Sequence, residues 1–222
     1  PLTIGARGAA VKGFLNLASS AAYFMSEEKG GLQFDIDKFR DHLSQIKDEG
    51  VIIFGFTYVI YAELIEKLMA ENIKIKLPEN SMFVHIGGWK KLEDRKVSKA
   101  VFNKTVSDIF SIPEDHVVDF YGFTEQMGVT YPDCECGWKH TPSFAEILIR
   151  NEANQEIVPD GTQGMIELIT PIPHSYPGNV VLTDDLGVIA SESEPPCTRK
   201  RSGTRFKILG RIKKSEPRGC GD

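Results

Sequence analysis

The chain has 222 residues, and 41% of them are hydrophobic, which is enough to fill a sizeable core. It carries 26 Lys and Arg residues against 31 Asp and Glu residues, a net charge of −5. This balance argues against a nucleic acid or an anionic membrane surface as the main partner, because both favour a basic face. No apolar stretch approaches the roughly 20 residues of a membrane span, and the four cysteines are too few for a disulfide scaffold. The first residues lack the order of a secretory signal, so we expect a soluble, cytoplasmic α/β protein.

The first half of the chain alternates segments of helical periodicity with short apolar runs typical of buried strands. We expect helices over residues 34–49, 58–72 and 99–110, and strands over residues 51–56, 82–86 and 117–121. Gly50 is expected to end the first helix. This alternation predicts a parallel sheet with crossover helices.

The second half is rich in β segments, which we expect at residues 145–150, 164–169, 180–183, 187–190 and 205–209. Residues 158–162 form a strong turn signal, and residues 191–201 are the most loop-like part. The predicted fold is therefore α/β, with a parallel sheet followed by a β-rich distorted barrel. We expect residues 1–130 to be the nucleotide-binding part and residues 131–222 the β-rich part of one structural unit.

Three short motifs follow predicted strands, and the first two fall at the strand ends where open parallel sheets bind ligands. Gly87-Gly88-Trp89 fits either a flat ligand against the backbone or a plain strand-to-helix turn. In residues 121–125, an aromatic ring, a hydroxyl and a carboxylate could meet a base, a phosphate and Mg²⁺, or Thr124 could simply cap a helix. In Thr183-Asp184-Asp185, a carboxylate could accept from two ribose hydroxyls, or the segment could be an ordinary turn.

The order of these motifs is more specific than any one of them. A glycine pair, a YGxTE string, a TxD string and then Gly210-Arg211 recur in adenylate-forming enzymes, which activate carboxylates with ATP, and the chain resembles that superfamily. Longer strings narrow the match: HIGGWKK, VPDGTQG, SYPGNVVLTDDLGVI and KKSEPRGC. With these strings the chain resembles the acyl-protein synthetase (LuxE) family, the long-chain fatty acid–protein ligase component of bacterial fatty-acid reductase. The resemblance extends from about Phe34 to Cys220.

The resemblance implies a role for each matching residue. Gly87, Gly88 and Trp89 would form a wall against the adenine and the acyl chain, and Tyr121, next to Gly122, would stack on the adenine. Thr124 would face the α-phosphate and Glu125 would bind Mg²⁺. Asp185 would hold the ribose, and Arg211 would lie near the same sugar and phosphate. Lys213 would lie at a hinge, and Cys220 would accept the acyl group.

The implied activity is ATP-dependent conversion of a fatty acid to an acyl-adenylate, followed by transfer to Cys220 and delivery to an acyl reductase subunit. Glycines flank Cys220 and Arg218 lies nearby, which suits a mobile thiolate. Two other readings stay open: an acyl- or aryl-CoA ligase similar to phenylacetate–CoA ligase, and a degenerate nucleotide-binding module. Because no Ser/Thr/Gly-rich phosphate loop occurs, we expect the adenylate-forming domain to be incomplete at its N-terminus.

The other three cysteines form a separate pattern. Cys134, Cys136 and His140 are spaced as C-x-C-x₃-H, and Cys197 lies in the later loop. Four such ligands could make a closed structural Zn²⁺ site, as in related CoA ligases. The C-x-C spacing is tighter than the usual C-x₂-C, so ordinary cytoplasmic thiols remain the alternative.

Overall fold

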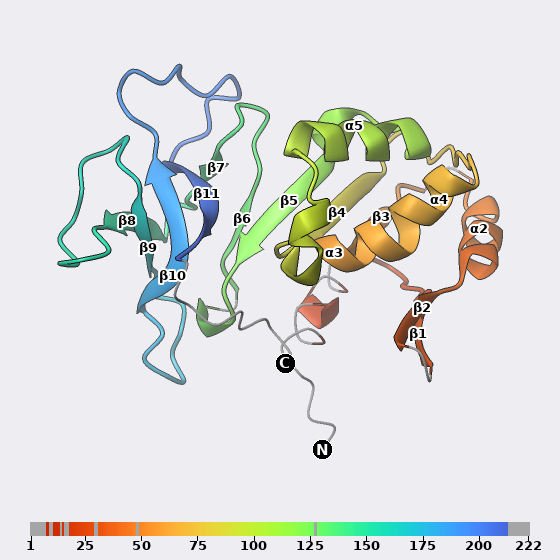
Figure 1. Cartoon of the computed structure of the whole chain (residues 1–222), viewed down its shortest axis with the longest axis horizontal. Helices are drawn as coiled ribbons and strands as arrows, with labels where there is room; N and C mark the ends of the chain where they lie inside the picture. Colours follow the sequence, from red (N-terminus) through yellow and green to blue (C-terminus); the bar gives the residue numbers. More distant parts are fainter. Residues whose placement is uncertain are drawn as a thin grey trace. The chain divides into compact units, whose positions relative to one another are not determined.

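The computed structural model of the chain describes Gly8, Leu15 and residues 11–13, 18–28, 31–47, 49–126 and 128–212. These residues divide into two compact units, with the boundary after Asp119, inside strand β5 (Val117–Gly122). Figure 1 labels the helices and strands of both units. Each unit has its own hydrophobic core, and each is described by itself below.

The first unit opens with a small hairpin and a helix. Strands β1 (Met25–Glu28) and β2 (Gly31–Phe34) pair antiparallel, and α2 (Ile36–Ser44) follows. Asp35 begins the helix, because its carboxylate accepts a hydrogen bond from the backbone N–H of Lys38 at 2.9 Å. The prediction that Gly50 ends this helix is wrong. The helix ends at Ser44, where the N–H of Gln45 bonds back to the carbonyl of His42.

The alternation of strand and helix is confirmed over the next 60 or so residues. β3 (Ile52–Phe56) pairs in parallel with β4 (Met82–Ile86), and between them lies one long helical segment. That segment is α3 (Thr57–Val59), the π-helical turn η2 (Ile60–Ile65) and α4 (Glu66–Ala70). The strand β3 is less buried than expected, since Ile52 is 40% exposed.

The rest of the first unit contains α5 (Lys99–Phe110), whose bounds are those predicted, and two 3₁₀ turns, η3 (Lys90–Arg95) and η4 (Glu114–His116). Ser98 caps α5 by accepting from the N–H of Val101. One core joins these elements, with buried side chains from α2, the η2–α4 segment, β4 and α5. Burial of this apolar surface is the main force that holds the helices on the strands.

The sheet of β3 and β4 continues with β5 and β6 (Thr130–Pro132), in the order β3-β4-β5-β6. β6 runs antiparallel to β5, with Tyr121 opposite Tyr131. A 3₁₀ turn, η5 (Thr124–Gln126), connects the two strands. Gly122 was expected to begin a loop, but it is the last residue of β5.

The second unit is built on a curled antiparallel sheet of five strands in the order β7-β11-β10-β9-β8. Their bounds are β7 (Lys139–His140), β8 (Glu146–Arg150), β9 (Gly164–Ile169), β10 (Val180–Ile189) and β11 (Arg205–Arg211). The α/β fold class, with a parallel sheet followed by a distorted barrel-like sheet, is therefore confirmed.

The two strands expected at residues 180–183 and 187–190 are one strand. β10 runs through Thr183, Asp184 and Asp185, and its pairing with β9 shifts between Leu182 and Leu186. The turn interpretation of this segment is wrong, because a bulge absorbs the irregular residues without reversing the chain. Within the described residues, no helix is both long and apolar enough to cross a membrane.

Candidate adenylate site

Asp185 is the centre of a hydrogen-bonded cluster in the second unit. Its carboxylate accepts from the hydroxyl of Tyr121 at 2.9 Å and from Nε of Arg211 at 2.9 Å. Asp185 and Arg211 are register partners on β10 and β11, two strands that Figure 1 shows side by side. Three residues that the resemblance assigns to the adenosine half of ATP therefore lie together.

The bulge in β10 fixes the direction of this carboxylate. The Thr183 hydroxyl donates to the carbonyl of Ile166 at 2.9 Å and accepts from the N–H of Asp185 at 3.1 Å. The residue Asp185 is 9% exposed, so the guanidinium of Arg211, and not bulk water, is the main partner of its carboxylate. Hydrogen bonds on both sides of the carboxylate make this a rigid acceptor.

The cluster shifts the pKa of two of its members, Tyr121 and Arg211. Burial, together with the negative charge of Asp185, raises the pKa of Tyr121 well above its ordinary value. Burial alone would lower the pKa of Arg211, but its hydrogen bond to Asp185 and the charge of that carboxylate raise it. Both shifts keep the protons on the Tyr121 hydroxyl and the Arg211 guanidinium, the two groups that donate to Asp185.

Glu125, expected to bind Mg²⁺, is exposed on the turn η5. Its carbonyl accepts a hydrogen bond from the hydroxyl of Tyr176. A side chain on Gly178 would overlap the same carbonyl, so only glycine fits there. The loop before β10 thus holds the turn that carries Glu125.

Gln126 also fastens the turn η5 to the loop before β10, and the sequence analysis missed this residue. It is 1% exposed, and its amide donates to the carbonyls of Leu168 at 3.0 Å and Gly178 at 2.8 Å. On the other side of the loop, Asn179 donates to the carbonyls of Thr170 and Pro173. The strings YGFTEQ and SYPGN lie far apart in the sequence. The only sign that they meet was that both belong to the motifs by which the chain resembles its family.

In the first unit, Gly87 follows β4 with φ +84, and open space surrounds both Gly87 and Gly88. The buried hydroxyl of Thr57 donates to the carbonyl of Gly87 at 2.6 Å and lies 2.9 Å from Nδ1 of His85. Thr57 therefore fixes this turn, a role that the sequence did not indicate.

Trp89 is 8% exposed and packs in the core of the first unit, with its ring 4.7 Å from that of Tyr61. Its predicted role as a ligand wall stays a prediction. Three other predicted features cannot be placed: Lys213 and Cys220 lie outside the described residues, as does the side chain of Thr124.

The remaining predicted ligands come together in the second unit. The ligand atoms of Cys134, Cys136, His140 and Cys197 all lie within 4.8 Å of one another. Loss of water around the sulfur raises the pKa of Cys136 to about 11, and burial lowers the pKa of His140. The cluster is separate from Asp185 in the sheet, because its members lie in loops and at the short edge strand β7.

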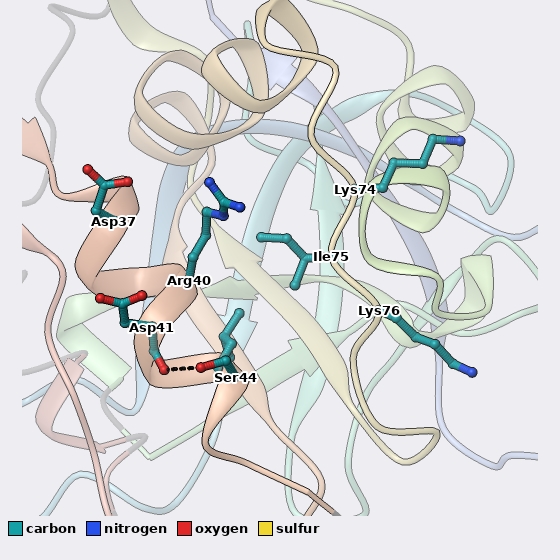
Figure 2. A pocket seen from close by; sticks show the side chains of 8 residues that line it. Asp37, Arg40, Asp41, Ser44, Lys74, Ile75 and Lys76 are labelled. Atoms are coloured by element: carbon teal, nitrogen blue, oxygen red, sulfur yellow. Dashed lines mark hydrogen bonds between the residues drawn. The ribbon is translucent and has the colours of Figure 1, made fainter.

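A shallow pocket of about 410 Å³ lies elsewhere, between α2 and the extended segment after α4. In Figure 2, Asp37, Arg40 and Asp41 project from α2, while Lys74 and Lys76 point away from that helix. None of the predicted site residues lines this pocket, and we assign it no role in the reaction.

A family model for acyl-protein synthetase, LuxE, matches residues 2–222. The chain belongs to this family. It is 24% identical over 191 residues to a long-chain-fatty-acid–luciferin-component ligase of Aliivibrio fischeri, covering 85% of the chain and 49% of that relative. The ligase of the same description from Vibrio harveyi is 23% identical over 214 residues, or 95% of the chain and 53% of the relative. This acyl-protein synthetase chain thus spans about half the length of the curated relatives it matches.

Solved structures share its fold. One is a 2-hydroxyisobutyryl-CoA ligase in complex with 2-HIB-AMP and CoA. The match covers 95% of this chain and 43% of the chain of that ligase, with 18% identity and a TM-score of 0.63. Another is a long-chain-fatty-acid-CoA ligase from Archaeoglobus fulgidus. The match covers 81% of this chain and 37% of the chain of that ligase, with 15% identity and a TM-score of 0.54. The fold is that of adenylate-forming ligases.

Proposed function

We propose that the protein containing this chain activates a fatty acid with ATP as an acyl-adenylate and passes the acyl group to Cys220 for delivery to an acyl reductase subunit. The observation that carries this proposal is the Tyr121–Asp185–Arg211 cluster, found in a member of the acyl-protein synthetase family at the positions expected for adenine and ribose. The family's curated relatives, named as fatty-acid ligases, support the choice of substrate.

The first step makes a poor electrophile reactive. A fatty carboxylate oxygen attacks the α-phosphorus of ATP, and the bond to the β-phosphate oxygen breaks, giving a mixed anhydride and pyrophosphate. In this step the fixed carboxylate of Asp185 accepts from the ribose hydroxyls, and Arg211 keeps that carboxylate in place. The ring of Tyr121 offers an aromatic face for the adenine.

Negative charge gathers where the carboxylate meets the triphosphate. The exposed carboxylate of Glu125 supplies a hard oxygen ligand, which fits Mg²⁺. When bound, Mg²⁺ neutralises phosphate charge at the reacting centre. Tyr176, Gln126 and Gly178 keep the turn that carries Glu125 in position.

The second step moves the acyl group to sulfur. The thiolate of Cys220 attacks the acyl carbon, the bond to the phosphate oxygen breaks, and AMP leaves. This splits one difficult substitution into two easier ones. The resulting thioester is an acyl donor of the kind that a reductase can use.

Fatty-acid-dependent exchange of pyrophosphate into ATP tests the first step in the intact protein. Labelled fatty acid with Mg·ATP then tests the second, and we expect a protein-bound label that neutral hydroxylamine releases. Cys220→Ser should abolish the label but retain exchange, because the variant still forms the adenylate. Equal labelling of the variant would overturn the role of Cys220.

The same experiment separates the two alternatives. Exchange with rapid formation of acyl-CoA, and no protein-bound label, would favour a CoA ligase. Consistent absence of exchange with every fatty acid tested would favour a nucleotide-binding module without catalysis. Either result would overturn the proposed function.

A further inference from the structure

Two separate segments of the second unit bring three sulfurs and one imidazole together. Cys134 and Cys136 lie in the turn between β6 and β7, and His140 is the last residue of β7. Cys197 comes from the long loop between β10 and β11. The strand β11 pairs antiparallel with β7, with Arg205 opposite His140, so the loop returns to the turn.

The spacing of the ligand atoms fits a tetrahedral ion. With Zn–S near 2.3 Å and Zn–N near 2.0 Å, a tetrahedron places two sulfurs about 3.8 Å apart and a sulfur and nitrogen about 3.5 Å apart. Sγ of Cys134 lies 3.7 Å from Sγ of Cys197, and Sγ of Cys136 lies 3.4 Å from Nε2 of His140. Both distances match those of ligands that share one zinc ion.

Neighbouring backbone groups orient the ligands. Nδ1 of His140 donates to the carbonyl of Ser202 at 3.2 Å, so Nε2 carries the lone pair that faces the sulfurs. In the loop of Cys197, the N–H of Lys200 bonds to the carbonyl of Cys197 at 2.9 Å, which fixes the backbone that carries this sulfur.

The turn that carries the two nearest cysteines is itself well defined. The N–H of Cys134 bonds to the carbonyl of Trp138 at 2.9 Å, and the N–H of Gly137 bonds to the carbonyl of Cys134 at 2.8 Å. An ion pair between Glu135 and Arg199 joins the turn to the loop of Cys197. The ligands are thus positioned by structure that does not depend on a sulfur–sulfur contact.

We propose that Cys134, Cys136, His140 and Cys197 bind one structural Zn²⁺ that fastens the β10–β11 loop to the β6–β7 turn. Three soft sulfurs and one imidazole favour zinc over the hard cations. Four protein ligands leave no open coordination position, so the ion acts in folding and not in catalysis. Each ligating thiol loses its proton to solvent when the metal binds.

The loop that the ion holds leads directly into β11. That strand begins at Arg205, pairs with β7, and ends at Arg211, the partner of Asp185. Fixing the start of β11 therefore supports the register in which Arg211 reaches Asp185. The zinc proposal itself does not rest on the proposed function, because it concerns metal content and folding.

Metal analysis of the intact protein, purified without added zinc, tests the site directly. We expect about one zinc per chain, as in closed structural sites. Cys136→Ser and Cys197→Ser should each weaken zinc binding by more than about 100-fold, beyond the loss typical of an outer-shell change. Cys220→Ser is the matched cysteine control, and His174→Asn, at an exposed histidine, is the control for His140→Asn; both should retain zinc.

Two further measurements keep the test valid if a serine variant folds poorly. His140→Cys should retain zinc, because four sulfurs also make a closed site, whereas His140→Asn should lose it. Protein reconstituted with Co²⁺ should show the intense bands of tetrahedral cobalt with sulfur-to-metal charge transfer. A chelator should remove the metal and lower the melting temperature of the unmodified protein.

Several outcomes would overturn the proposal. One is a purified protein that contains no zinc, with the three cysteines of the cluster reacting freely with a thiol reagent. The others are a disulfide between Cys134 and Cys197, and iron in place of zinc. Equal zinc content in the unmodified protein and the Cys136→Ser and Cys197→Ser variants would show adventitious metal only. Loss of fatty-acid-dependent exchange with normal zinc content would instead count against the proposed function alone.

Discussion

Asp185 and its neighbour Asp184 offer a direct comparison at the residue scale. Asp185→Asn removes the negative charge opposite Arg211. The amide oxygen can still accept from the guanidinium and the NH₂ can donate to the hydroxyl of Tyr121, but the charge-assisted bond to Arg211 is weakened. We expect a loss of about 1–3 kcal/mol in the free energy of unfolding. The apparent KM for ATP should rise about tenfold, because a neutral amide is a weaker acceptor for the ribose hydroxyls than a carboxylate.

Asp184→Asn is the matched control, because Asp184 is exposed and is the neighbour of Asp185 in the same strand. Its stability should change by less than about 0.5 kcal/mol, as for most surface substitutions. Chemical denaturation and steady-state kinetics measure both effects. Equal kinetic losses in the two variants would contradict a ribose-binding role for Asp185.

The buried phenol of Tyr131 should make the free energy of unfolding depend on pH. It is 1% exposed, and its hydroxyl makes no hydrogen bond within the described part of the chain. Burial raises its pKa to about 12, so between about pH 10 and pH 12 the unfolded chain loses this proton while the folded chain keeps it. The free energy of unfolding therefore falls in this window as pH rises, by at most about 1.4 kcal/mol per pH unit for this group.

Tyr131→Phe removes that contribution, and the buried unpaired hydroxyl with it. We expect neutral or higher stability at pH 7 and a shallower decline above pH 10, measured by denaturation at each pH. Tyr121→Phe is the contrasting variant, because it loses the hydrogen bond to Asp185 and should be less stable at pH 7. A Tyr131→Phe variant that is markedly destabilised at pH 7 would refute this account.

At the scale of elements, the turn η5 and the loop before β10 behave as one piece. Gly178→Ala would place a methyl group against the carbonyl of Glu125 and the ring of Tyr176, so the turn or the loop must move. We expect a loss of about 1–3 kcal/mol, the usual cost of overpacking. Magnesium-dependent pyrophosphate exchange should fall with it, because Glu125 lies on that turn.

Gly88→Ala is the control for stability, since open space surrounds Gly88 and its backbone is not in the left-handed region. Its melting temperature should stay close to that of the unmodified protein. If Gly178→Ala unfolds at the same temperature as Gly88→Ala, the packing between the loop before β10 and the turn η5 is not rigid.

At the scale of the whole molecule, the two hydrophobic cores are distinct, one in each unit. The proposed zinc ion has all its ligands in the second unit. A ligand that binds only the folded form stabilises that form by mass action. Chelation should therefore reduce hydrogen-exchange protection in β7, β10 and β11, and leave that of α5 largely unchanged.

Hydrogen exchange read by mass spectrometry, before and after chelation, measures this difference along the chain. Readdition of Zn²⁺ should restore the protection, and Mg²⁺ at the same concentration should not, because it prefers hard oxygen ligands. Protection lost uniformly from both units would show that the metal does not act through the second unit.

The local pattern of the sequence determined several elements closely. The helix Lys99–Phe110 and the strand Gly164–Ile169 have the bounds that were predicted. Apolar spacing and a capping residue decide such segments, and both are local. The limits of the first helix were not predicted, because its last turn closes on its own carbonyls well before Gly50.

For the site, the motifs identified Tyr121, Asp185 and Arg211, but not how they would be arranged. Asp185 was expected at a strand end, and it lies inside β10 at a bulge, because pairing with β9 and β11 continues on both sides. Gln126 and Thr57 gave no signal, since each acts on carbonyls of residues distant in the chain.

The sequence by itself thus determined the alternation of elements, the family, and the residue types available for chemistry, since these are written in short strings. Only the tertiary structure decided which of them meet. Asp185 meets Arg211 because β10 pairs with β11, and it meets Tyr121 although β5 belongs to the other sheet. Cys197 reaches Cys134 because β11 returns beside β7. Pairing between distant strands depends on packing across the whole sheet, which no local periodicity encodes.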